Sequence, residues 1–182
     1  MLKDTVVDIL KSVTDAILNH EDVAGILNKT VSLICQKLKV ESCSIYTYDR
    51  QSDCLILTAS EGFASKSIGL KMKQGEGING HIFESRRQVN MANPEKHPAY
   101  KYFKETGEER FHSYLGIPMM AGSSCIGVFI IQSSRKTRFH EDIVDMAINL
   151  ASQLAIVVAN ADIDKIFSDH SLTEKEKTQH DV

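Results

Sequence analysis

The N-terminal part of the chain has apolar residues spaced three or four positions apart, which is the spacing of one face of an α-helix. The first such segment runs from Leu2 to Ile17 and is followed by a polar break at 19–21. Asp22 is of the residue type that caps helix N-termini, and a second apolar face then continues to Leu38. The pattern therefore predicts two amphipathic helices in succession.

The period changes to two at residue 42, where β-branched and aromatic residues become frequent. The alternation predicts a strand, a polar turn and a returning strand, which together form an antiparallel hairpin. A second hairpin is predicted around Ala121-Gly122-Ser123, and its second strand is apolar enough to be covered on both faces. The predicted strands span residues 42–48, 54–60, 68–73, 88–92, 111–120 and 124–133.

Further helices are predicted between and after these strands. One or two helical turns are expected over His81–Arg86, and a brief helix over Ala99–Glu105. The final helix is predicted from about Glu141 to Ile166 and is apolar on more than one side, so it needs the sheet and a second partner to cover it. Ser168–Val182 is polar and lacks periodicity, which is typical of a linker or a disordered tail.

Helices at both chain ends around hairpin-connected strands predict an α+β domain with an antiparallel sheet. A length of 182 residues suits one such domain over 1–167 with a tail over 168–182. With 21 basic and 24 acidic residues, the composition excludes a strongly basic nucleic-acid-binding protein and gives no electrostatic reason for attachment to an anionic membrane. No apolar run approaches the roughly 18–20 residues of a membrane-spanning helix, and the N-terminus lacks the apolar core of a signal peptide. We therefore expect a cytoplasmic protein with neither nucleic acid nor membrane as a partner.

The cysteines and histidines give no sign of a disulfide framework, a metal site or a cofactor. The four cysteines form no Cys-x-x-Cys pair and lie in apolar stretches, where a free cysteine behaves as a small hydrophobic residue. None lies in a glycine-rich turn or polar loop, the setting expected of a reactive thiolate. The seven histidines include neither a His-x-x-His nor a His-Glu-x-x-His pair. We expect reduced cysteines in the core and no metal.

Two loop segments are candidates for ligand binding. The glycine cluster at 74–80 lacks the Lys-Ser/Thr pair of a phosphate-binding loop, so we interpret it as a strand-to-helix turn in which glycine supplies a positive φ. A helix N-terminus just after Gly77 is able to present backbone N–H groups to an anionic ligand. We interpret the charged run at 104–110 as a solvated loop, in preference to an ion-pair lid with Arg110 beside Phe111 and His112.

The order of motifs over roughly residues 5–163 resembles that of a GAF domain. The resemblance rests on Thr58-Ala59-Ser60-Glu61-Gly62, Gly75-Glu76-Gly77-Ile78-Asn79-Gly80, Leu115-Gly116-Ile117-Pro118 and Ile126-Gly127-Val128. The stretch from His97 to Pro118 is more specific, and is similar to the N-terminal GAF domain of the nitrogen-branch enzyme I, a phosphoenolpyruvate-protein phosphotransferase.

This resemblance implies a six-stranded antiparallel sheet with the terminal helices on one face and a small-molecule pocket under short helices and loops on the other. In the family, the domain precedes a phosphotransfer region and is thought to report nitrogen status, with glutamine or 2-oxoglutarate as the signal. The chain carries no Ser-His-x-Ala-type phosphorylation segment. We therefore expect an excised regulatory domain without catalytic residues, whose partner is its own phosphotransferase region in the full-length protein.

The resemblance also implies which residues bind the metabolite. Arg110 is expected to pair with a ligand carboxylate, while aromatic side chains exclude water. The implied ligand-binding residues are Ser60, Phe63, Gly77, Ile78, Tyr100, Phe103, Arg110, His112 and Tyr114.

Two other functions stay open at this point. The terminal helices are able to pair with a second copy, so a ligand-free homodimerisation module is the first alternative. A free methionine sulfoxide reductase-like enzyme is the second, although Asn79 stands in the glycine turn where such enzymes carry a reactive cysteine. The Asn-Lys-x-Phe signature of cyclic-nucleotide-binding relatives is not matched by Asn28-Lys29-Thr30-Val31, and the bilin-attachment motif of phytochromes has no counterpart.

Overall fold

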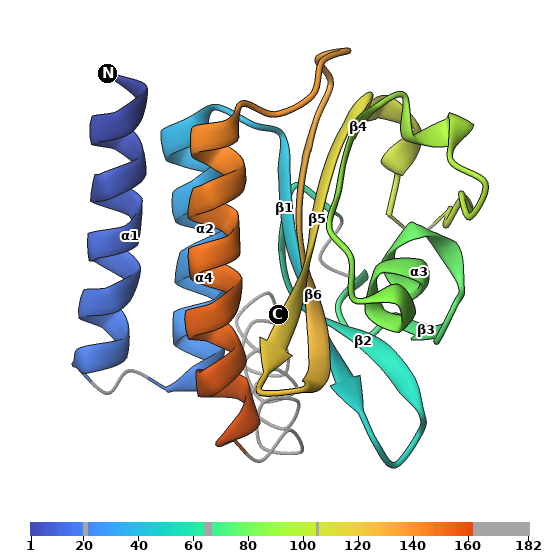
Figure 1. The fold of residues 1–182 in the computed structure, drawn as a ribbon, viewed down its shortest axis with the longest axis horizontal. Helices are drawn as coiled ribbons and strands as arrows, with labels where there is room; N and C mark the ends of the chain where they lie inside the picture. Colours follow the sequence, from blue (N-terminus) through green and yellow to red (C-terminus); the bar gives the residue numbers. More distant parts are fainter. Residues whose placement is uncertain (20–21, 64–66, 105, 162–182) are drawn as a thin grey trace, which may run out of the picture.

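The fold consists of layers on either side of one antiparallel sheet (Figure 1). A computed structural model describes residues 1–19, 22–63, 67–104 and 106–161. The helices α1 (Leu2–Leu18), α2 (Val23–Leu38) and α4 (Glu141–Ala159) lie on one side of the sheet, with α1 outermost. The short helix α3 (Gly77–Ser85) lies on the other side. This is the predicted α+β architecture, with the terminal helices together on one face.

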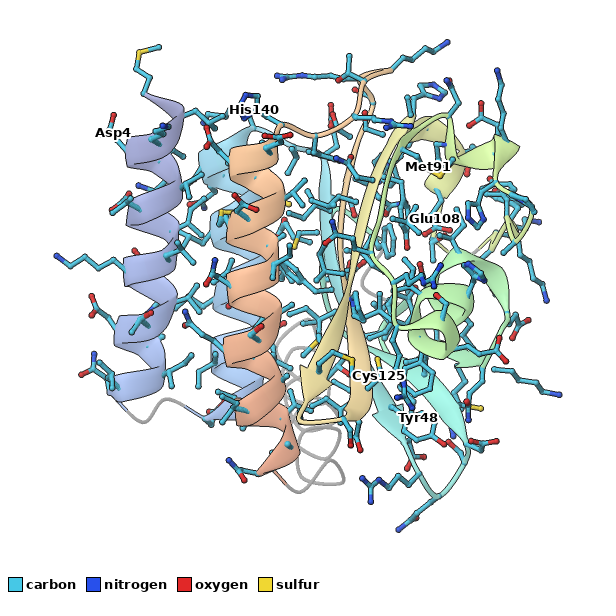
Figure 2. All side chains as sticks on the ribbon, in the orientation of Figure 1. Asp4, Tyr48, Met91, Glu108, Cys125 and His140 are labelled. Atoms are coloured by element: carbon cyan, nitrogen blue, oxygen red, sulfur yellow. The ribbon has the colours of Figure 1, made fainter. Side chains whose placement is uncertain are left out.

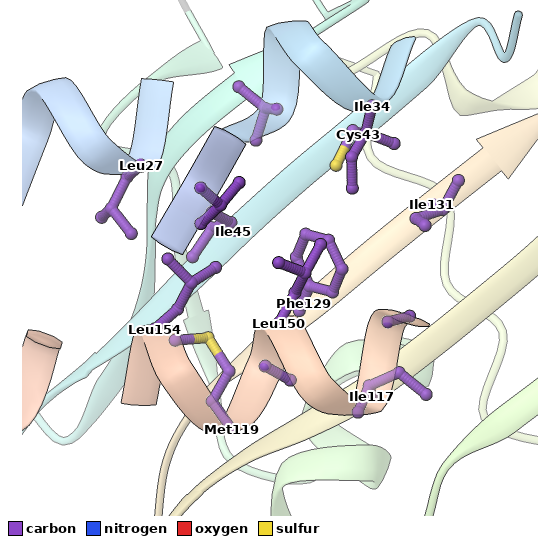
Figure 3. Packing of buried hydrophobic residues seen from close by; sticks show 14 of the residues in the cluster. Leu27, Ile34, Cys43, Ile45, Ile117, Met119, Phe129, Ile131, Leu150 and Leu154 are labelled. Carbon is purple, nitrogen blue, oxygen red and sulfur yellow. The ribbon is translucent and has the colours of Figure 1, made fainter. Parts of the chain in front are cut away.

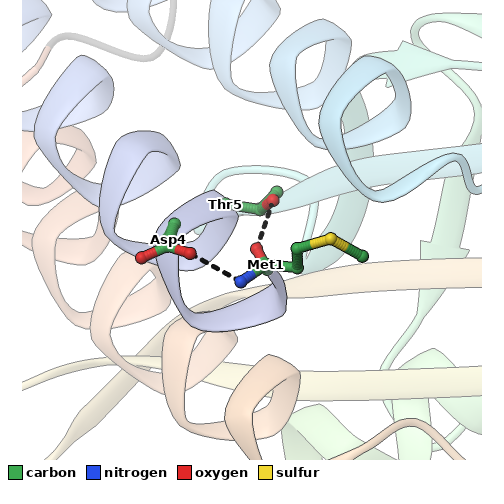
Figure 4. Close-up of polar contacts among 3 residues, drawn as sticks. All are labelled: Met1, Asp4 and Thr5. Atoms are coloured by element: carbon green, nitrogen blue, oxygen red, sulfur yellow. Dashed lines mark hydrogen bonds and ion pairs between the residues drawn. The ribbon is translucent and has the colours of Figure 1, made fainter.

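Polar side chains fix the starts of both N-terminal helices. The Met1 ammonium donates to Asp4 Oδ2 at 2.6 Å, and Thr5 Oγ1 donates to the Met1 carbonyl at 3.0 Å (Figure 4). Asp22 accepts a hydrogen bond from the Gly25 backbone N–H at 2.6 Å and caps α2, as its position in the sequence predicts. Asp22 therefore satisfies a free N–H group at the start of α2, whereas the contacts at the start of α1 involve the Met1 ammonium and the Thr5 hydroxyl.

The sheet has six strands, and hairpin formation determines their arrangement. Its neighbours are antiparallel throughout, in the order β3-β2-β1-β6-β5-β4. The two predicted hairpins, β1 with β2 and β5 with β6, meet through β1 and β6 at the centre of the sheet. The strands are β1 (Ser42–Asp49), β2 (Cys54–Glu61), β3 (Lys71–Lys73), β4 (Val89–Ala92), β5 (Ser113–Ala121) and β6 (Ser124–Ser133).

Alternation along these strands gives the sheet two apolar faces. The outer face packs against the helices and forms the larger core, in which strand side chains meet those of α2 and α4 (Figure 3). Residues at its centre include Leu27, Ile34, Ile45, Phe129, Leu150 and Leu154, all fully buried. The inner face carries a second cluster, including Tyr46, Leu55, Leu57, Tyr114, Val128 and Ile130, which packs against α3 and the loop after β4.

The broad apolar surface of α4 is covered from two directions. Its eight buried residues pack against β5 and β6 on one side and against α1 on another, so α1 is the second partner that the sequence required. At 19 residues, α4 is long and apolar enough to cross a membrane, which corrects the expectation that no such segment exists. Its burial between the sheet and α1 explains this composition.

Several predicted boundaries are wrong. The helix predicted from His81 begins at Gly77, and the strand predicted from Ile68 is confined to Lys71–Lys73. The expected helix is not formed over residues 99–104, which are irregular with turns at 99 and 104. In the described part of this loop, short 3-10 helices occur at Pro94–Lys96 and Glu108–Arg110 instead. The last helix ends at Ala159, and the predicted tail over 168–182 lies outside the described residues.

A candidate ligand-binding cavity on the inner face of the sheet

A long loop between β4 and β5 covers the inner face of the sheet. We call residues 93–104 and 106–112 of this loop the strap. The two ends of the strap meet, since the Asn93 backbone N–H donates to the His112 carbonyl at 2.7 Å. A connection of this length in a compact domain is usually functional. The strap is therefore the natural cover of any site on this face.

Two polar contacts attach the strap to neighbouring elements. Lys101 forms an ion pair with Glu76, the residue that precedes α3. Arg110 donates to the carbonyl of Gly62 just after β2, and its guanidinium lies 4.9 Å from the centre of the Phe111 ring. A side chain at Gly77 would meet the Phe103 ring at 3.3 Å, so this glycine, with φ of 67°, allows the strap to approach α3 closely. The strap is attached on both sides of the cavity beneath it.

The cavity beneath the strap is small and mixed in polarity. Its volume of about 20 Å³ has room for about one water molecule. Aromatic and aliphatic side chains make up most of the wall, but an acid, a lysine and two amides also line it. The lining residues are Met72, Ile78, Asn79, Pro94, Tyr100, Lys101, Phe103, Glu108, Tyr114 and Gln132.

Glu108 is the titratable group that distinguishes this cavity. It lies on the 3-10 helix Glu108–Arg110 of the strap, on the side of the sheet opposite the long helices (Figure 2). Burial raises the pKa of its carboxyl from 4.5 to about 7, and hydrogen bonds with Gln132 and Thr106 offset only part of that effect. The Gln132 amide nitrogen lies 3.5 Å from Glu108 Oε1, which is a weak contact. An acid with this pKa is half protonated near neutral pH.

The inner face beside Glu108 carries buried polar atoms without partners. Ser42 and Ser44 on β1, Ser60 on β2 and Gln132 on β6 form what we call the polar strip. Ser44 pairs with Ser60, and Ser42 with Gln132, so the four residues are neighbours across three strands. The three serine hydroxyls and Gln132 Oε1 are buried and make no hydrogen bond within the described part of the chain. Native proteins rarely leave such atoms unsatisfied, which makes the polar strip a candidate contact for a ligand.

A tyrosine–amide pair forms the floor of the cavity next to the polar strip. The buried Tyr114 hydroxyl donates to Asn79 Oδ1 at 2.6 Å and so connects β5 to α3. Burial, with the nearby Glu108 carboxylate as a smaller cause, raises the pKa of Tyr114 well above its usual value, so the phenol stays neutral. This hydrogen bond fixes the orientation of Asn79 and places α3 relative to the sheet.

The structure brings some of the expected ligand-binding residues together and separates others. Ile78, Tyr100, Phe103 and Tyr114 line the cavity, and Gly77 adjoins it through Phe103. The remaining four expected residues are not among the lining residues. Ser60 belongs to the polar strip, Phe63 stacks near Phe111 with ring centres 6.2 Å apart, Arg110 is exposed, and His112 pairs by its backbone with Asn93 and Ser133.

Sequence reasoning missed the polar lining of the cavity. The charged run predicts a solvated loop around Glu108, and the structure corrects this, because Glu108 is one of the residues that line the cavity. The signal available in the sequence was Gly107, whose φ of 65° redirects the chain just before Glu108. Gln132 and Asn79 gave a weaker signal: each is a lone amide within an otherwise apolar stretch.

Thiols and metal ligands are not gathered at this site. All four cysteines are free, and none lines the cavity. Burial raises the pKa of Cys35 to about 12 and shifts that of Cys43 and Cys125 upward, so little thiolate forms. Among the residues that the structure describes, no group of three or more His, Cys, Asp or Glu side chains is placed to hold a metal ion.

A larger hollow lies away from the strap. It has a volume of about 680 Å³ and is bordered by the β1–β2 turn, by Phe83 and Arg86 near the end of α3, and by residues at the end of α4. Ala161, the last described residue, forms part of its edge. We assign no ligand to this hollow.

Comparisons with known proteins agree with this architecture. The family model "GAF domain" matches residues 22–158. The solved GAF domain from a phosphoenolpyruvate-protein phosphotransferase of Coxiella burnetii is 31% identical, with a TM-score of 0.83 over 88% of this chain and 96% of that one. A free methionine-R-sulfoxide reductase of Neisseria meningitidis, solved with its substrate, aligns with a TM-score of 0.75 over 86% of this chain and 90% of the reductase chain. The two sequences are 18% identical, so this match shows a likeness of fold alone.

A curated relative indicates the kind of protein in which such a domain occurs. The "Phosphoenolpyruvate-dependent phosphotransferase system" protein of Salmonella typhimurium is 26% identical over 165 residues, which are 90% of this chain and 22% of the relative. The chain therefore spans about a fifth of that protein's length. Taken with the matched family model, these similarities show that the chain belongs to the GAF domain family and is homologous to the GAF domains of phosphoenolpyruvate-protein phosphotransferases.

Proposed function

We propose that this chain is the small-molecule-sensing regulatory domain of a phosphoenolpyruvate-protein phosphotransferase of the nitrogen branch. In this proposal it acts in the cytoplasm and is not itself an enzyme. It controls phosphoryl transfer by a phosphotransferase region of the same full-length protein. The similarity to phosphotransferase GAF domains supports the assignment of the parent protein, and the cavity beneath the strap supports the sensing role.

The observation that carries the proposal is the set of unsatisfied polar atoms under a tethered loop. A cavity filled by apolar side chains would be explained by packing alone. Here Glu108 and Gln132 face the cavity, and the hydroxyls of the polar strip have no partner in the described structure. Of the polar strip, only Gln132 lines the cavity. A polar ligand that also satisfies the serine hydroxyls would therefore require the strap to change position.

Isothermal titration calorimetry of this chain with L-glutamine and with 2-oxoglutarate tests the proposal. We expect one of the two to bind with a dissociation constant in the millimolar range or tighter, with one site per chain. Absence of heat with both ligands at millimolar concentrations would refute this choice of signal. Urea, which is small and polar, serves as the control for nonspecific binding.

A second role, homodimerisation through the terminal helices, is supported by apolar side chains left on their outer surfaces. Val7 and Leu18 on α1 are 62% and 68% exposed, and Ile156 on α4 is 62% exposed. Sedimentation equilibrium is expected to show a dimer that Ile156→Glu weakens. A wild-type chain that stays monomeric at high concentration would refute this role. Dimerisation and sensing are compatible, because the helices contact the same sheet that forms the floor of the cavity.

The reductase alternative has less support. It needs a reactive thiolate at the site, whereas the described cavity is lined by Asn79 and not by a cysteine. We expect no reduction of free methionine sulfoxide by the chain in the presence of a thiol reductant. Turnover in that assay would favour the reductase over the regulatory role.

A further inference from the structure

We propose that the cavity recognises its ligand through N–H groups, with the Glu108 carboxylate and Gln132 Oε1 as the acceptors for an ammonium or primary amide group. The inference rests on the proposed sensing function and specifies the chemistry of the same site. It favours a nitrogen-bearing ligand over a purely anionic one such as a dicarboxylate.

The first argument is the hydrogen-bonding capacity of the cavity wall. An ionised carboxylate and an amide oxygen only accept hydrogen bonds. Gln132 is 2% exposed, lines the cavity, and its Oε1 has no partner within the described residues. Asn79 Oδ1 already accepts from Tyr114. A ligand in the cavity would therefore meet an unpartnered acceptor at Gln132 Oε1 beside the Glu108 carboxylate, and would bind both through donors of its own.

The second argument is that two cations of the strap are engaged elsewhere. The Lys101 ammonium is paired with Glu76, and Arg110 donates to the Gly62 carbonyl from an exposed position. An anionic ligand at Glu108 would lie against that carboxyl group, and the cation among the lining residues, Lys101, is already paired with Glu76. An anion and the ionised Glu108 carboxyl would repel each other in this desolvated site, whereas an ammonium group would be attracted by the carboxylate and by the aromatic faces.

The third argument is size. A volume of about 20 Å³ accepts one group the size of water, which is also the size of an ammonium ion or of the nitrogen end of an amide. A whole amino acid is larger, so its binding requires the strap to move outward. The Lys101–Glu76 ion pair is accessible to solvent, and such pairs contribute little to stability, so breaking it when the strap opens on this side costs little free energy.

The test is a calorimetric comparison of ligands and variants of this chain. L-Glutamine carries both an ammonium and an amide group, ammonium chloride supplies the cation alone, and 2-oxoglutarate has neither. The variants are Glu108→Gln, which removes the charged acceptor at constant size, and Glu109→Gln, a matched control on the same 3-10 helix whose side chain is exposed. Thermal unfolding of each variant checks that the fold is retained.

We expect L-glutamine to bind the wild type, with its affinity reduced about tenfold or more by Glu108→Gln and unchanged by Glu109→Gln. This factor corresponds to the loss of a hydrogen bond to a charged group. If L-glutamine binds equally well to Glu108→Gln, the acceptor assignment is overturned while the sensing function stands. If 2-oxoglutarate binds and L-glutamine does not, the acceptor assignment is likewise overturned while the sensing function stands. No binding by any of the three probes overturns both proposals.

Proton release provides a readout that a structural role of Glu108 would not produce. The groups around this carboxyl are Glu109 on its own helix, Thr106 and Lys101 of the strap, Gln132, and the phenols of Tyr46, Tyr100 and Tyr114. With its pKa at about 7, about half of the carboxyl is protonated at pH 7. Binding of an N–H donor requires the carboxylate, so titrations in buffers of different ionisation enthalpy should show release of about half a proton, absent in Glu108→Gln. An unchanged proton count in the wild type would overturn the role of Glu108 as acceptor.

Discussion

Glu108→Gln is the substitution whose effect on stability follows most directly from the structure. The wild-type carboxyl is partly buried, and its pKa is raised from 4.5 to about 7 because burial disfavours the charged form. The folded chain therefore holds this proton more tightly than the unfolded chain does. Stability contributed by the neutral carboxyl is fully present below pH 4.5 and is lost as the pH rises to about 7, after which the loss is constant.

The magnitude follows from the size of the shift. A change from 4.5 to about 7 is about 2.5 units, and each unit corresponds to about 1.4 kcal/mol, which gives roughly 3 to 4 kcal/mol for the penalty above neutral pH. Glu108 is not fully buried, and solvent screening reduces the expected value to about 2 kcal/mol. Glutamine has nearly the same size but no charge. The variant should therefore be more stable than the wild type by about 2 kcal/mol at pH 8 and of similar stability at pH 4.5.

Urea denaturation of both proteins from pH 4.5 to pH 8, followed by far-ultraviolet circular dichroism, measures this difference. Other titrating groups cancel when the variant is compared with the wild type at each pH, and Glu109→Gln should give a small difference that does not vary with pH. A Glu108→Gln difference that is the same at every pH would refute the buried-carboxyl account. In that case the charged Glu108 carboxylate would not destabilise the folded chain, and a ligand that ionises Glu108 would have no such destabilisation to offset.

Three other substitutions test the elements that position the site. Asp22→Ala removes the cap of α2 and should destabilise the chain by about 1 kcal/mol in urea denaturation; no change would contradict the capping role. Gly116→Ala places a Cβ 2.4 Å from Ile82 Cδ1 and should lower the free energy of unfolding by about 1–3 kcal/mol in the same assay. An unchanged urea midpoint would show that α3 shifts to accommodate the methyl group without loss of stability. Lys101→Ala should change global stability by less than about 1 kcal/mol yet speed hydrogen exchange in strap residues 94–104. Unchanged exchange there would show that this ion pair does not restrain the strap.

The layered architecture was predictable because it depends on hydrophobic patterns that repeat over many residues, so that a single exception does not change the prediction. The three-four spacing of α1 and α2 and the alternation of β1 specify buried faces, and Asp22 marks a helix start by its side-chain chemistry alone. The broad apolar surface of α4 correctly indicated two partners. Which partner would cover it was not predictable, because that depends on how α1 packs in three dimensions.

The site was predictable only in part, because its polar residues depend on the path of the strap. Tyr100 and Tyr114 were expected to face the ligand, and both line the cavity. Arg110 was expected to meet a ligand carboxylate, yet the 3-10 helix directs its neighbour Glu108 into the cavity while the guanidinium contacts Gly62 outside it. A cavity lined by Glu108 favours a ligand with a positively charged group, whereas one lined by Arg110 would favour a carboxylate. Which of the two side chains lines the cavity depends on this single backbone turn, and hydrophobic periodicity does not predict it.

The central claim is that the cavity beneath the strap binds a nitrogen-bearing metabolite, and a titration followed by 15N–1H correlation spectroscopy tests it most directly. L-Glutamine should shift the backbone amide of Glu108 and the side-chain amides of Gln132 and Asn79, while amides of α1 far from the cavity stay unchanged. Spectra that remain superimposable at those three residues, at glutamine concentrations of several millimolar, would contradict the claim.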